Sequence, residues 1–197
     1  MVRAAFHILL WSAFLISVQV HAARGSLEKV GQASPFERRF QELDAADQRI
    51  FRALQEGITE AEALRVARRE WPSVELLAQQ GIPPFAPDPL DKARYTWTIL
   101  KSKNIVNYAG TPAPESGRAS FLVILIEPEH GAPASPQAQV DETHHRLSDG
   151  TMIHATLWMG PRLTALREPV AFVVPEQGFR QILVGPSSAL PPAPSGG

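Results

Sequence analysis

The 197-residue sequence predicts an α+β fold in which N-terminal amphipathic helices pack on an antiparallel β-sheet. Three observations lead to this class. Apolar residues recur at helical spacing in the first half of the chain. From Tyr95 onwards the apolar period changes to two, and a later run of β-branched residues, 119–126, has the length of a buried strand.

The N-terminal segment has the pattern of an export signal. Arg3 precedes an apolar run from Ala4 to Val20, and the run ends in Val20-His21-Ala22. These are the three regions of a signal peptide, so residues 1–22 are expected to be removed and the rest to be periplasmic or secreted. The alternative is an uncleaved inner-membrane anchor with the domain outside the cytoplasm, because about 20 apolar residues can span a bilayer.

Residues 23–94 are expected to form a helical region. Ser34 is a candidate N-cap before Pro35, and apolar residues from Phe36 to Ala67 then recur at helical steps. Gly57 leaves two interpretations open, one bent helix or two helices. Ser73 is expected to cap a short helix, 74–80, and a stiff proline-rich connector follows it at 82–89.

Residues 95–186 are expected to form an antiparallel β region that packs with the helical region as one domain. Strands 95–100 and 104–108 pair across a turn at 101–103, and 119–126 is the central strand. A hairpin around Asp149-Gly150 and two short strands, 169–174 and 179–184, complete the sheet. The last residues, 187–197, have the composition of a disordered tail.

Composition excludes several classes of function. The net charge of −1 gives no basic surface for nucleic acid. Cysteine is absent, which rules out disulfides, thiolate metal sites and a cysteine nucleophile. The sequence also lacks the glycine-rich motifs of nucleotide-binding sites and the nucleophile elbow of hydrolases. We therefore expect a protein that is not an enzyme.

Four of the six histidines lie between residues 130 and 154, and three of them flank a hairpin turn, Ser148-Asp149-Gly150. If Asp149-Gly150 is a two-residue loop, His145 lies opposite His154. If Gly150 is a bulge residue after the turn, His144 lies opposite His154 instead. In both alignments the opposed Cβ atoms are about 4.5–5.5 Å apart, close enough for two imidazoles to bind one metal ion.

The sequence therefore predicts a metal site with His144 or His145 and His154 as the primary ligands. Glu142 and His130 are the candidates that would complete the coordination sphere. Imidazole with a carboxylate suits zinc, or copper or nickel, better than calcium. The alternative interpretation is a set of surface histidines that bind no metal.

The middle of the chain adds a resemblance, carried by the aromatic strand 95–97 and by the run from Trp71 to Ala86, which contains Leu77-Ala78-Gln79-Gln80-Gly81-Ile82-Pro83-Pro84-Phe85. It resembles an uncharacterised family of bacterial exported or membrane-anchored proteins. The resemblance implies an envelope protein linked to metal-uptake systems, with an envelope transporter or another envelope protein as partner. The membrane is a partner only if the N-terminal segment is uncleaved.

The order of apolar segment, helix and sheet also looks like the outline of pilins, although no prepilin cleavage site precedes the apolar run. Two functions follow. The first is an exported accessory protein that binds a zinc-like metal in support of metal uptake. The alternative is a pilin-like structural or protein-interaction module of the envelope without metal.

Overall fold

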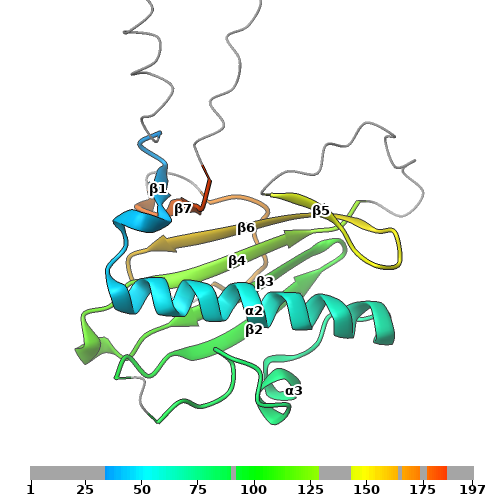
Figure 1. Cartoon of the computed structure of the whole chain (residues 1–197), viewed down its shortest axis with the longest axis horizontal. Coiled ribbons are helices and arrows are strands. Elements are labelled where there is room, and N and C mark those ends of the chain that lie inside the picture. The colour runs from blue at the N-terminus through cyan, green and yellow to red at the C-terminus, as the bar shows by residue number, and fades with distance from the viewer. Residues whose placement is uncertain (1–33, 90–91, 129–142, 164–165, 174–176, 186–197) are drawn as a thin grey trace, which may run out of the picture. The chain divides into compact units, whose positions relative to one another are not determined.

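The computed structural model consists mainly of a twisted sheet with one long helix on its face (Figure 1). The structure describes residues 34–89, 92–128, 143–163, 166–173 and 177–185. Within them the sheet has seven strands: six follow the order β1-β7-β6-β4-β3-β2, and β5 pairs with β6 beside this path. Every neighbouring pair is antiparallel except β1 with β7, which is parallel. The predicted α+β class, helices on a mainly antiparallel sheet, is confirmed.

The strands lie within one unit of the chain, Pro35–Gly185. In chain order they are β1 (Glu37–Arg39), β2 (Thr96–Ser102), β3 (Ile105–Thr111), β4 (Ser120–Ile126), β5 (His144–Arg146), β6 (Met152–Gly160) and β7 (Arg180–Leu183). The helical elements are the 3-10 turns η1 (Phe40–Glu42) and η2 (Pro114–Ser116) and the helices α2 (Ala45–Arg68) and α3 (Val74–Gln79). None of the helices in the described ranges has the length and apolar character needed to cross a bilayer.

Helix α2 begins later than the sequence predicted. Ser34 is not its N-cap. The cap is Asp44, whose side chain accepts hydrogen bonds from the Ala46 and Asp47 backbone N–H groups. The residues before it form β1 and η1, because the Glu37–Arg39 backbone pairs with β7 near the other end of the chain. A partner so distant in sequence leaves no local periodic signal.

Gly57 does not break the helix, so one helix runs from Ala45 to Arg68. A Cβ atom at this position would stand 2.2 Å from the carbonyl oxygen of Pro83. The glycine therefore permits close approach of the proline-rich connector to α2. Helix α3 begins where predicted, with the Ser73 hydroxyl accepting from the Leu76 N–H.

The strand predictions held in the centre of the sheet and failed at two places. β4 lies between β3 and β6 and is almost wholly buried, as its apolar sequence predicted. The β2–β3 turn is shorter than expected, because Ser102 already pairs with Ile105. Residues 169–173 form no strand. The buried Asn107 side chain instead bonds both the N–H and the carbonyl of Val170, which fastens this segment to the sheet.

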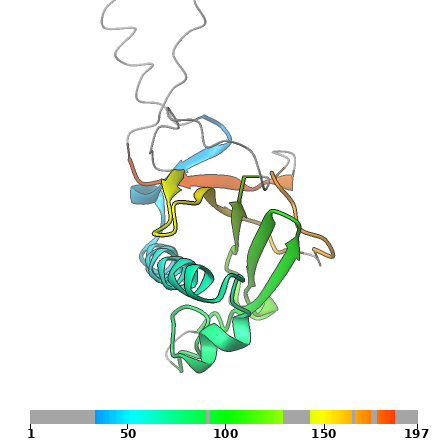
Figure 2. The ribbon, with the colours of Figure 1, turned by 90° about the vertical axis from the view of Figure 1, so that its right-hand side faces the viewer.

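Each face of the sheet has its own apolar core. The α2 face is the larger, and Figure 2, which views α2 near its axis, shows the sheet curving around the helix. Its most buried side chains include Phe51, Leu54, Tyr108, Phe121 and Ile153. The opposite face packs Leu122 and Ile124 against Val173 and Phe179. The two faces matter for the histidine hairpin, because neighbouring residues of a strand point to different faces.

Candidate metal centre

The turn that joins β5 to β6 decides which histidine meets His154. The Leu147 N–H donates to the Thr151 carbonyl, the Gly150 N–H donates to the Leu147 carbonyl, and Gly150 has a φ of 90°. Leu147 therefore faces Thr151, and Gly150 is the extra residue of a bulge. Of the two alignments left open by the sequence, the second is the one observed.

His144 and His154 consequently form a cross-strand pair. Nε2 of His144 lies 2.9 Å from Nδ1 of His154, and the ring centroids are 4.4 Å apart. Both residues are half-buried. Ile153, the neighbour of His154, is buried in the core on the α2 side, so the histidine pair lies on the other face of the sheet.

Thr143 holds one ring of this pair. Its Oγ1 lies 3.0 Å from Nδ1 of His144, the nitrogen that faces away from His154. If Nδ1 carries the proton and donates it to the threonine, Nε2 keeps its lone pair toward His154. A histidine that ligates a metal is usually oriented in this way by a hydrogen bond from its second nitrogen.

His145 belongs to a different contact. It pairs with Ile153 on β6 and lies on the α2 side, where its Nε2 is 2.9 Å from Oε1 of Glu62. The Glu62 side chain is only 13% exposed. Burial raises the pKa of Glu62 above its ordinary value, and the His145 ring opposes that rise. His145 therefore anchors the hairpin to the helix and does not face His154.

A second polar contact fixes the same hairpin. Nη1 of Arg65 on α2 lies 3.3 Å from Oδ2 of Asp149 in the turn. Hydrogen bonds from Thr151, above all from its backbone N–H, lower the pKa of Asp149, and Arg65 adds to this effect. The hairpin is thus held at its turn and along β5, which leaves the His144–His154 pair on a supported strand.

The structure brings together two of the five predicted ligands. Glu142 and His130 lie outside the described residues. Within the described ranges, no group of three or more histidines, aspartates or glutamates lies close enough to hold a metal ion. The described residues therefore offer a pair of imidazole nitrogens, and a metal ion held there would need further ligands.

Glu62 and Thr143 are the functional contacts that sequence reasoning missed. Thr143 was within reach, because it directly precedes His144. Glu62 was not, because Thr59-Glu60-Ala61-Glu62 has the spacing of a capping box and fits a second helix that begins after Gly57. In the structure the Thr59 hydroxyl instead bonds the Gln55 carbonyl within a continuous helix.

Comparison with known proteins places the chain in one family. Residues 38–182 match the model of a family of unknown function (DUF6162). The match spans β1 to β7 and includes the histidine hairpin. No curated protein and no solved structure matches the chain. The family description gives no activity, so the geometry of the site has to supply one.

Proposed function

The chain belongs to this family of unknown function, and we propose that it is an exported, non-catalytic accessory protein that binds a transition-metal ion through His144 and His154. The leader at residues 1–22 supports export. The resemblance of the 71–86 region to envelope proteins linked to metal uptake supports a role beside a transporter.

The separation of the two imidazole nitrogens carries the metal proposal. Two nitrogens bound to one tetrahedral zinc ion at about 2.0–2.1 Å are roughly 3.3 Å apart. Nε2 of His144 and Nδ1 of His154 are 2.9 Å apart, at hydrogen-bond distance, so a bound metal ion would replace the proton between them. A small rotation of either ring opens this distance, so the metal site needs no change in the strands.

The chemistry of the ligands narrows the choice of metal ion. Neutral imidazole binds zinc, copper and nickel well and binds calcium and magnesium poorly. Two protein nitrogens leave at least two positions of a tetrahedral ion for other ligands. Glu142 and His130 are the candidates from this chain. A group from a transporter would compete for the same positions, which suits transfer of an ion better than permanent storage.

The chain provides its own control for the test. His144→Ala and His154→Ala each remove one nitrogen of the pair, whereas His145→Ala removes a neighbouring imidazole that faces α2. Purified protein without a histidine tag is titrated with zinc chloride near pH 7.5 in a calorimeter. We expect one equivalent for the wild type, roughly tenfold or greater loss of affinity for His144→Ala and His154→Ala, and a clearly smaller loss for His145→Ala, which loosens the hairpin but keeps both nitrogens.

Three outcomes would overturn the proposal. They are an absence of zinc binding by the wild type, equal binding by all three variants, or loss of binding only in His145→Ala. Unchanged stoichiometry in the first two variants favours the pilin-like interaction module. Copper and nickel titrations of the same proteins identify the preferred ion.

A further inference from the structure

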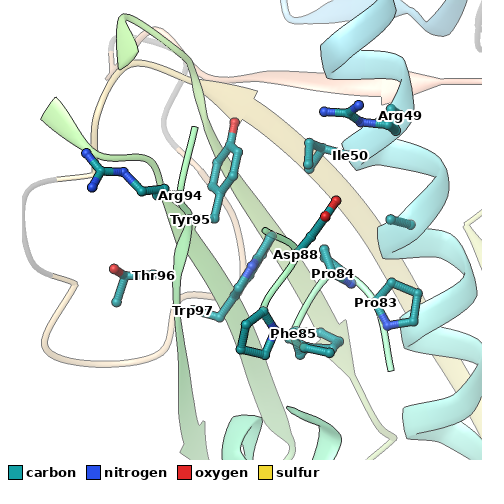
Figure 3. Close-up of a pocket in the computed structure, with 13 residues that line it drawn as sticks. Arg49, Ile50, Pro83, Pro84, Phe85, Asp88, Arg94, Tyr95, Thr96 and Trp97 are labelled. Carbon is teal, nitrogen blue, oxygen red and sulfur yellow. The ribbon is translucent and has the colours of Figure 1, made fainter. Parts of the chain in front are cut away.

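A separate hollow of about 420 Å³ lies between α2, the proline-rich connector and the start of β2 (Figure 3). Pockets that bind small molecules have volumes of about 300–1,000 Å³. The hollow has none of the histidines of the metal site in its lining. It is therefore a candidate binding site separate from the histidine pair.

Two glycines fix the walls of this hollow. The connector lies tightly on α2, because Pro83 occupies the space that a Cβ atom of Gly57 would need. The Trp97 indole lies on β3 in the same way, 2.4 Å from where a Cβ atom of Gly110 would stand. The first contact packs backbone against backbone and the second packs a side chain against backbone, so the walls of the hollow are formed before a ligand arrives.

Aromatic rings form its floor. Trp97 contacts Phe85 edge-on, with ring centroids 5.4 Å apart, and stacks on Tyr95 at 5.7 Å and 26°. Prolines of the connector extend this apolar surface. Such walls favour a flat apolar body that can stack or pack edge-on against the rings.

One donor in the lining of the hollow lacks an acceptor in the part of the chain that the structure describes. Trp97 is 8% exposed, and its indole Nε1 is buried without a hydrogen-bond partner among the described residues. Leaving such a donor unpaired costs about 1–3 kcal/mol. Figure 3 shows Arg49 on α2 and Asp88 on the connector, and both residues belong to the lining of the hollow. Arg94 is already paired with Glu115 outside the hollow.

We propose that this hollow binds a compact aromatic monocarboxylate. The ring would pack against Phe85, Tyr95 and Trp97, and the carboxylate would bind the Arg49 guanidinium. A ligand oxygen directed inward would give the Trp97 N–H its missing acceptor. The lining holds Arg49 and Arg94, and Arg94 already pairs with Glu115, so a second carboxylate on the ligand would lack a cation of its own.

Cinnamate and its neutral amide, cinnamamide, serve as probes. Each is titrated into the ¹⁵N-labelled protein while the indole N–H resonances are followed, with the Trp97 signal identified by its loss in Trp97→Phe. We expect cinnamate to move the Trp97 signal in a saturable way and to bind roughly tenfold more tightly than cinnamamide. Arg49→Gln should remove that preference.

Arg52→Gln is the matched control, because Arg52 lies one turn away on α2 and its guanidinium stacks over Phe40 outside the hollow. This variant should bind cinnamate like the wild type. The proposal is overturned if cinnamate leaves the Trp97 signal unmoved, if both probes bind equally to the wild type, or if the two arginine variants behave alike. Metal binding by the histidine pair is measured separately and does not affect these results.

Discussion

Nε2 of His145 lies 2.9 Å from Oε1 of Glu62, a residue on the helix that covers the sheet. The preceding residue, His144, contacts His154 on the other face of the same sheet. Two adjacent imidazoles thus have different neighbours because residues alternate across a strand. One connects the hairpin to the helix, and the other contacts His154 across the strands.

The Glu62–His145 contact predicts a pH-dependent stability defect. His145→Ala leaves the Glu62 carboxylate mostly buried without its partner, and we expect a loss of about 1–3 kcal/mol in the free energy of unfolding at pH 7. Burial already raises the pKa of Glu62 above 4.5, and removing His145 raises it further. A raised folded-state pKa stabilises the folded state below the unfolded pKa, and this contribution is lost as the pH rises through the folded value.

The defect of His145→Ala should therefore be smallest below about pH 4.5 and grow toward neutral pH. Urea unfolding across this range measures it. Glu62→Gln removes the titrating group. The loss of stability that His145→Ala causes in the Glu62→Gln protein should therefore not depend on pH. A defect of the same size at every pH contradicts the assignment of this contact.

The sequence was sufficient wherever the structural cause is local. The apolar β-branched run of β4 predicted a central strand, and Ser73 predicted the start of α3. It was insufficient for β1, because Glu37–Arg39 is charged and becomes a strand only through its backbone pairing with β7. The aromatic residues Phe36 and Phe40 flank this segment at a helical spacing, so the local pattern indicated the wrong element.

The same distinction holds at the candidate site. The Asp149-Gly150 signal located the hairpin and limited the partner of His154 to one of two residues. The choice between them depends on the backbone conformation of Gly150, which the residue type alone does not determine. The contact with Glu62 depends on how α2 packs against the sheet, and no feature of the hairpin sequence encodes that packing.

Replacing Gly57 by alanine should change stability in the opposite direction to the usual glycine-to-alanine change in a helix. Gly→Ala in an exposed helix interior stabilises by about 1 kcal/mol. At Gly57 the new methyl group would stand 2.2 Å from the Pro83 oxygen, so Gly57→Ala should destabilise by about 1–3 kcal/mol. Ala63→Gly, at an exposed position of the same helix, should show the ordinary cost of about 1 kcal/mol. Thermal or urea unfolding tests both, and a more stable Gly57→Ala would refute the tight contact.

Arg65 predicts the largest single loss of stability. It binds Glu127 through two hydrogen bonds, of 2.7 and 3.1 Å, and the two side chains are only 12% and 13% exposed. The Trp71 indole donates to the same carboxylate at 2.7 Å. Arg65→Met leaves that carboxylate without its cation, and we expect a cost of about 3 kcal/mol in urea unfolding at pH 7.

Two further variants separate the loss of this ion pair from the general effect of replacing an arginine on α2. Arg68→Met changes an exposed arginine of the same helix and should cost less than about 0.5 kcal/mol. Arg65→Met combined with Glu127→Leu should be less damaging than Arg65→Met alone, because the buried Glu127 carboxylate is no longer left without its cation. Equal losses in the single and double variants would mean that the carboxylate is not the source of the defect.

The Asp44 carboxylate should contribute to the stability of the fold at neutral pH and lose this contribution in acid. Its carboxylate caps α2 and also binds Arg118, with Oδ2 2.5 Å from Nη1. The Asp47 backbone N–H, then Arg118, lowers the pKa of Asp44 below 3.8. Asp44→Ala should cost about 1 kcal/mol at pH 7. Asp44→Asn keeps a capping oxygen and should cost less, because the Asp44 side chain is 56% exposed and such surface ion pairs contribute little.

A lowered folded-state pKa stabilises the protein above the unfolded value, and the stabilisation is lost as the pH falls through the folded value. The difference between wild type and Asp44→Asn should therefore be constant at neutral pH and shrink once the pH falls below about 3.8. Urea unfolding of both proteins at several pH values measures this difference. A gap that widens in acid would show that Asp44 does not act through its charge, because only the loss of that charge makes the two side chains alike.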